Sequence, residues 1–275
     1  MTLPVPLIDH VVVNVRDGLD QAAGLWTRLG FQLTPRGHHT LGSSNNLAIL
    51  GTDYIELLGV APGANRTDVL DWPAGLNGLV FKTADSDRLY ATLSEAGVPV
   101  LPPQAFSRPV DMGGDQPGSK HPDAAFRTVR LERDAVPSGR MFFCHHLTPD
   151  LVWHDPWRRH PNGATGIHAF LIAATDPAAY AALFALMFGE AAVRPTPTGF
   201  ILTAGLASIV VDTPDALAFS DLGDRSSAMA GLVIRTASLE RTRAVLVLGG
   251  FEAPTAGPLT IPPTLAGGLT LTFVE

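Results

Sequence analysis

Two residues with metal-binding side chains lie in runs that are typical of buried strands. His10 stands in "IDHVVVNV" and Glu56 in "DYIELLGV". Alternate side chains of a strand share a face, so Val11, Val13 and Val15 would face a helix and leave His10 on the opposite face of the sheet. A glutamate among apolar residues is costly to bury unless it is paired or bound to an ion. If the two strands are neighbours ~4.8 Å apart, both side chains converge on one ion.

A third ligand is expected from the run "GRMFFCHHLTP". Aligning its end with the C-terminal "LTLTFVE" places His145 where Glu56 stands in its own strand, and turns His146 and Cys144 toward the helices. A slip of one residue would exchange the two histidines, so this choice stays open. Two imidazoles and one carboxylate suit a divalent ion such as Zn, Fe, Mn or Ni, with open positions for substrate or water.

The segments that position these residues repeat along the chain. "NGLVFKTADSDRLYATLSEAGV" (77–98) aligns with "AGLVIRTASLERTRAVLVLGGF" (230–251), and both run from a strand through a helix to a glycine. Residues 8–31 follow the same plan, and 166–189 is a more degenerate copy. Each helix is followed by shorter apolar runs divided by turn residues. The sequence therefore predicts four βαβββ units.

A segment rich in proline and tryptophan separates these units into two pairs. We expect an N-terminal domain over 1–147 that carries the site, a linker over 148–165 and a degenerate C-terminal domain over 166–275. The second unit has a Gly- and Pro-rich insertion over 102–126. We interpret it as a loop that overlies the site, although a plain surface loop has the same composition.

Composition excludes several classes of function. The 275 residues carry a net charge of −7. The basic residues are scattered apart from "WRRH" at 157–160, which argues against a nucleic acid partner. No window is typical of a signal peptide or a membrane span, and a single cysteine fits a reducing compartment. We therefore expect a cytoplasmic protein with no membrane partner.

The pattern resembles the vicinal oxygen chelate superfamily, which includes glyoxalase I and the extradiol dioxygenases. "IDHVVVNV", "YIELLGV" and "FFCHHLTPDLVW" are similar, more narrowly, to the glyoxalase-like domain family, most strongly over residues 7–165. The resemblance implies an α+β fold in which four βαβββ units form two open-barrel halves, and a metal that binds two substrate oxygens. Resembling proteins carry Glu near the place of His145, and Gly231 and Val210 occupy ligand places in the C-terminal half.

The same resemblance places a turn at the mouth of the cavity. There His38 could move a proton and Asn45 could orient a carbonyl, although such residues also satisfy local backbone groups in turns. Arg108 and Arg127 could clamp an anionic substrate oxygen. Arg108, in the insertion, is the better candidate of the two.

Three functions follow from these observations. The first is a metal-dependent lyase or isomerase acting on a small carbonyl or enediol-forming substrate, with proton transfer by Glu56 or His38. The second is a non-catalytic protein that sequesters small molecules such as hydrophobic drugs. The third is a degenerate scaffold that mainly dimerises, so a homodimer is a possible assembly. The set His10, Glu56 and His145 favours the enzyme.

Overall fold

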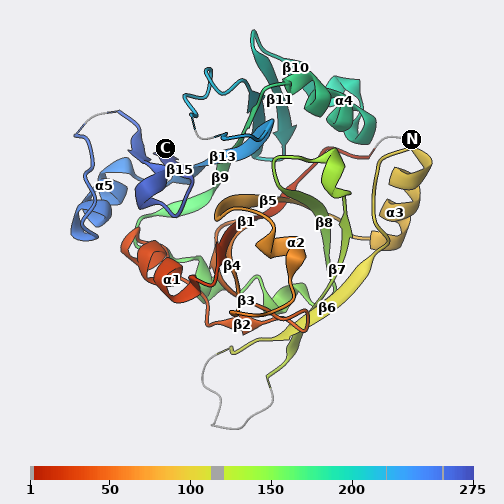
Figure 1. Cartoon of the computed structure of the whole chain (residues 1–275). Coiled ribbons are helices and arrows are strands. Elements are labelled where there is room, and N and C mark those ends of the chain that lie inside the picture. Colours follow the sequence, from red (N-terminus) through yellow and green to blue (C-terminus); the bar gives the residue numbers. More distant parts are fainter. Residues whose placement is uncertain (1–2, 113–120, 221, 256) are drawn as a thin grey trace.

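Two β-sheets and a few helices make up the chain, which is therefore a mixed α+β protein (Figure 1). The structure is a computed structural model and describes residues 3–112, 121–220, 222–255 and 257–275. Within these residues the first sheet has the strand order β2-β3-β4-β1-β5-β8-β7-β6, and the second has the order β10-β11-β12-β9-β13-β15-β14.

The elements of the first sheet come from the N-terminal part of the chain. They are β1 (Ile8–Arg16), α1 (Leu19–Arg28), β2 (Gly37–His38), β3 (Ser43–Ile49), β4 (Tyr54–Val60), α2 (Thr67–Leu70), β5 (Gly75–Lys82), α3 (Ser86–Glu95), β6 (Gln104–Pro109), β7 (Asp123–Arg130) and β8 (Arg140–His146). The short 3-10 turn η1 (Arg133–Ala135) precedes β8, and η2 (Pro149–Leu151) and η3 (Asp155–Arg158) follow it.

The elements of the second sheet follow in chain order. They are β9 (Ala164–Ala174), α4 (Pro177–Phe188), η4 (Glu190–Ala192), β10 (Val193–Pro195), β11 (Gly199–Ala204), β12 (Ala207–Asp212), β13 (Ser227–Thr236), α5 (Leu239–Leu248), β14 (Leu259–Ile261), η5 (Pro263–Leu265) and β15 (Thr270–Val274).

Two details differ from the sequence-based prediction. The insertion over 102–126 is not all loop, because β6 and β7 pair as an antiparallel hairpin on either side of residues 113–120, which lie outside the described residues. In the fourth unit, residues 251–255 form no strand. Pro254 lacks the N–H that a strand ladder needs, which accounts for that loss.

The first sheet curls around α2 (Figure 1). Val11 and Val13 of β1 face outward into a large apolar cluster that contains residues of both sheets and of the helices. Val12 faces inward, into a second cluster with residues such as Phe126 and Phe142. The alternation of β1 thus separates a structural core from the lining of the concave face.

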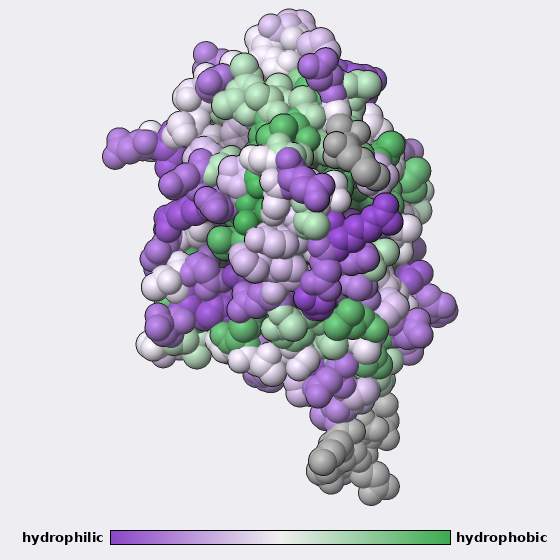
Figure 2. Space-filling model, turned by 90° about the vertical axis from the view of Figure 1, so that its right-hand side faces the viewer, coloured by the Kyte–Doolittle hydropathy of each residue, from purple (hydrophilic) through white to green (hydrophobic). Residues whose placement is uncertain are grey.

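Among the described residues, no helix is both long and apolar enough to cross a bilayer. Hydrophilic side chains cover much of the face seen in Figure 2, with small apolar areas between them. The cytoplasmic location, the homodimer and the domain boundaries remain predictions.

Candidate functional site

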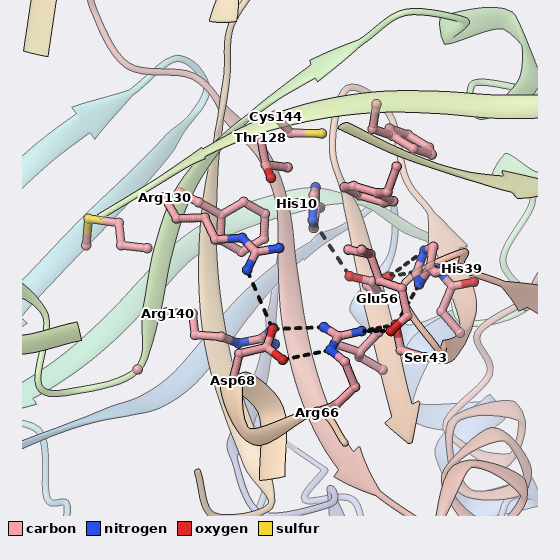
Figure 3. Close-up of a pocket in the computed structure, with 18 of the residues that line it drawn as sticks. His10, His39, Ser43, Glu56, Arg66, Asp68, Thr128, Arg130, Arg140 and Cys144 are labelled. Atoms are coloured by element: carbon pink, nitrogen blue, oxygen red, sulfur yellow. Dashed lines mark hydrogen bonds and ion pairs between the residues drawn. The ribbon is translucent and has the colours of Figure 1, made fainter. Parts of the chain in front are cut away.

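The concave face of the first sheet encloses a cavity of about 240 Å³. Residues of β1, β3, β4, β6, β7, β8 and α2 line it (Figure 3). Its histidines and charged lining residues are His10, His39, Glu56, Arg66, Asp68, Arg108, Arg130, Arg133 and Arg140. Such a cluster of titratable groups in a cavity is typical of a functional site.

Alternation along β1 turns His10 toward the cavity, and a bulge places Asp9 beside it. Ile8 pairs with Phe81 while His10 pairs with Val80, so Asp9 is an extra residue in the ladder. A bulge of this kind changes the direction of side chains. Here Nδ1 of His10 lies 2.6 Å from Oδ1 of Asp9. A carboxylate only accepts hydrogen bonds, so Nδ1 carries the hydrogen. The lone pair of Nε2 is then left for the cavity.

Asp9 also accepts a hydrogen bond from a second imidazole, that of His146, whose Nε2 lies 2.9 Å from Oδ1. Burial raises the pKa of Asp9, but the hydrogen bonds from His10 and His146 outweigh it and hold that pKa well below its usual range. Asp9 is therefore an ionised carboxylate that orients His10. Such a carboxylate–histidine pair is the usual support of a metal-binding imidazole.

Glu56 faces His10 from the neighbouring parallel strand β4. Oε2 of Glu56 lies 3.8 Å from Nε2 of His10, and Oε1 accepts a hydrogen bond of 2.6 Å from Nδ2 of Asn45. Burial raises the pKa of Glu56, but His39, His10 and Asn45 lower it below the ordinary value in net. Tyr54, two residues before Glu56, stacks on the His10 ring with centroids 4.4 Å apart. The predicted pair of His10 and Glu56 thus meets in the cavity, with Asn45 beside it.

His39, and not the predicted His38, reaches this pair. His38 is exposed and contacts Ser44, whereas Nε2 of His39 lies 3.8 Å from Oε1 of Glu56. Burial is the main reason why the pKa of His39 falls to about 4, so its imidazole is neutral at pH 7. Adjacent residues of a strand face opposite ways, and sequence alone gave no reason to prefer the second histidine.

Arg108 lines the cavity and Arg127 does not. Arg108 is 3% exposed, and its Nη2 has no hydrogen-bond partner among the described residues. A Cβ on Gly37 would lie 2.9 Å from Nη1 of Arg108, so a glycine is needed there to make room for the guanidinium. Arg127 points toward α3, where its Nη2 donates to Oδ1 of Asp87 at 2.7 Å.

The register of β8 keeps His145 away from His10 and Glu56. Phe142 and Cys144 line the cavity, while Phe143 packs into the helix-side cluster. His145 shares the face of Phe143, opposite Arg127 on β7, so the prediction that His145 takes the place of Glu56 is wrong. Cys144, expected in the helix-side core, lies on the cavity side.

The second unit has no metal-binding side chain at the positions that correspond to His10 and Glu56. Val12 pairs with Glu56 in the first unit, and Val80 pairs with Phe142 in the second, so Phe142 takes the place of Glu56. By the same correspondence, Gly78 of β5 stands where His10 stands in β1. Only two of these four corresponding strand positions, those of His10 and Glu56, carry a side chain of a type that binds metals.

A separate group has the residue types of a metal site. Asp9, Cys144 and His146 each offer a ligand atom, and among the described residues these atoms all lie within 4.8 Å of one another. Burial raises the pKa of the Cys144 thiol well above its usual value, whereas metals bind the thiolate. Asp9 already accepts hydrogen bonds from both histidines. The three residues therefore offer a second place for a metal ion and also form a hydrogen-bonded support for His10.

Comparison with known proteins agrees with this architecture. The chain is similar to a hypothetical protein from Staphylococcus aureus, with 13% identity, a TM-score of 0.68, and 98% of this chain and 99% of that one covered. A mutant of 4-hydroxymandelate synthase from Streptomyces coelicolor has 13% identity and a TM-score of 0.55, covering 95% and 78%. A fusion of a xylose isomerase-like TIM barrel with 4-hydroxyphenylpyruvate dioxygenase has 13% identity and a TM-score of 0.61, covering 99% and 49%.

These similarities show the fold alone. Curated protein sequences give no match. The model of the glyoxalase-like domain matches residues 8–188, which is more than half of the chain. The chain therefore belongs to the glyoxalase-like domain family, within the vicinal oxygen chelate fold.

Proposed function

We propose that this protein is a metal-dependent lyase or isomerase that acts on a small carbonyl or enediol-forming substrate. His10 and Glu56 are the proposed protein ligands of a divalent ion, Zn, Fe, Mn or Ni. The observation that carries this proposal is the approach of Nε2 of His10 to Oε2 of Glu56, 3.8 Å apart within one cavity.

The hydrogen bond of His10 and the charge of Glu56 suit metal binding. Asp9 fixes the hydrogen of His10 on Nδ1 and leaves Nε2 as a ligand atom. The lowered pKa of Glu56 keeps it a carboxylate at neutral pH. When bound, the ion would polarise a substrate carbonyl and stabilise the charge that develops on its oxygen.

The remaining residues have roles that follow from their positions. Glu56 is the proposed proton acceptor, and the Asn45 amide, which donates to its Oε1, holds the carboxylate in place. His39, neutral and beside Glu56, takes the proton-transfer role that the sequence suggested for His38. The unpaired Nη2 of Arg108 is available to an anionic substrate oxygen.

Metal analysis tests the proposal. Protein purified without chelators and without a nickel column should hold one equivalent of metal by mass spectrometry. His10→Ala and Glu56→Gln should each lose it, because each removes one of the proposed ligands. The exposed His38→Ala is the matched control and should keep it.

The Asp9, Cys144 and His146 group provides the discriminating arm of this experiment. Cys144→Ala should keep the metal if His10 and Glu56 bind it. Loss of metal in Cys144→Ala with retention in Glu56→Gln would place the ion at the other group and refute the proposed ligand set.

One observation favours a second function, a metal-free binder of small apolar molecules. Gly78 and Phe142 stand where the second unit would supply ligands, and the inward-facing cluster is apolar. Under this alternative the wild-type protein contains no metal under any condition. It would instead bind an apolar fluorescent ligand, and no metal at His10 would compete with that ligand.

A further inference from the structure

A second group of charged residues lies in the same cavity, apart from His10 and Glu56. Arg66, Arg130 and Arg140 gather around the single carboxylate of Asp68 (Figure 3). Arg66 donates to both oxygens of this carboxylate, with Nε 2.7 Å from Oδ1 and Nη2 2.9 Å from Oδ2. Nη1 of Arg130 lies 3.6 Å from Oδ2, which is an ion pair beyond hydrogen-bond distance. One carboxylate therefore serves three guanidinium groups.

Arg140 is the least satisfied of the three. Its Nε donates to Oδ1 of Asn77 at 2.9 Å, but its Nη2 is buried and has no hydrogen-bond partner among the described residues. Burial lowers the pKa of Arg140 to about 10, so the side chain still carries its charge at pH 7. A buried positive charge without a full partner is costly for a folded protein.

In the cavity as a whole, positively charged side chains also outnumber the negatively charged ones. Its lining holds five arginines and two carboxylates, those of Glu56 and Asp68. Arg133 is partly exposed and pairs with Asp71, with Nη1 3.1 Å from Oδ2. The others remain in excess over the two carboxylates, and an anionic ligand would supply the missing partner.

We infer that Arg130 and Arg140, with Arg66 held by Asp68, form a subsite for an oxyanion group of the substrate, a carboxylate or a phosphate. The inference deepens the proposed function and rests on it for the reacting end of the substrate. Because Arg66 also donates to Ser43, which contacts His39, the subsite and the His10–Glu56 pair border one continuous cavity. The cavity of about 240 Å³ has room for a small acid or phosphate ester that carries a carbonyl.

Anion binding to metal-free protein tests this subsite without relying on catalysis. Malonate and inorganic phosphate are titrated at constant ionic strength, with chloride as the reference, and the melting temperature and isothermal titration heat are recorded. At least one of the two anions should bind saturably to the wild-type protein. Stabilisation by malonate alone would identify a carboxylate, and stabilisation by phosphate alone would identify a phosphate.

Substitutions assign the binding to these arginines. Arg140→Met should weaken binding at least about tenfold, because it removes charge-assisted hydrogen bonds to the anion. Arg130→Met probes the same cluster without touching the Asn77 bond, and it decides the question if Arg140→Met does not fold. Arg194→Met, an exposed arginine of the second sheet, should bind like the wild type.

Two results would overturn the inference. One is a wild-type protein that responds to neither anion more than to chloride. The other is binding that survives Arg140→Met and Arg130→Met but disappears in Arg108→Met, which would move the anion to the His10–Glu56 end. Because the protein is metal-free in this experiment, the anion-binding result can be interpreted even if the metal proposal fails.

Discussion

Asp53 provides a quantitative test of the packing between the two sheets. It lies between β3 and β4, is 6% exposed, and its Oδ1 accepts a hydrogen bond of 3.0 Å from the backbone N–H of Ile167 in β9. Burial raises the pKa of Asp53 to about 7, although Ile167, Lys82 and Arg235 each act to lower it. The carboxyl group is therefore protonated in the folded protein over a pH range in which it is ionised in the unfolded chain.

The magnitude follows from the two pKa values. A rise from 3.8 to about 7, at about 1.36 kcal/mol per pH unit, corresponds to about 4 kcal/mol. Since the pKa of the folded state is the higher one, this stability is fully present below pH 3.8 and is lost as the pH rises through 7. In Asp53→Asn this dependence disappears, while the amide oxygen can still accept from Ile167.

Urea unfolding of the wild type and of Asp53→Asn from pH 4 to pH 8 measures the effect. The free energy of unfolding of the variant minus that of the wild type should increase by about 4 kcal/mol over this range. Taking the difference removes the pH dependence that comes from the titratable groups common to both proteins. Asp150→Asn, an exposed carboxylate, should show no such trend. A difference that stays flat with pH would refute the assignment of a buried, protonated Asp53.

Two further substitutions test the supports of the site. Asp9→Asn should lower metal affinity by about 10- to 100-fold, because it removes the carboxylate that orients His10; unchanged affinity in a chelator competition would contradict that role. Gly37→Ala should cost about 1–3 kcal/mol in urea unfolding, since its Cβ would lie 2.5 Å from Oδ1 of Asn45. Gly24→Ala is its control, with nothing within 4 Å of the new Cβ, and should stabilise helix α1 by about 0.5–1 kcal/mol.

The convergence of His10 and Glu56 could be predicted because it rests on local rules. Alternation along β1 set His10 apart from Val11 and Val13, and the cost of burying Glu56 indicated that it needs a partner. These arguments use only residues within one strand and the expectation that the first and fourth strands of a unit are neighbours. The parallel pairing of β1 with β4 confirms that expectation.

The choice between adjacent histidines needed the tertiary structure. His38 and His39, like His145 and His146, differ by one position, and one position reverses the face of a strand. Which face is which depends on pairing with strands far away in the chain, such as β7 for His145. The bulge at Asp9 is equally invisible in the sequence, because an extra residue in β1 is defined only against β5.

The amino-acid sequence by itself determined the strand–helix plan, the apolar faces and the pair of proposed ligands in the first unit, since periodicity and burial cost act over a few neighbouring residues. Only the tertiary structure decided that Arg66, Arg130 and Arg140 meet around Asp68, and that His39 stands beside Glu56. These residues come from separate strands, from a short helix and from positions directly next to them. Their approach is set by the curvature of the sheet, which brings together side chains that have no spacing rule in common.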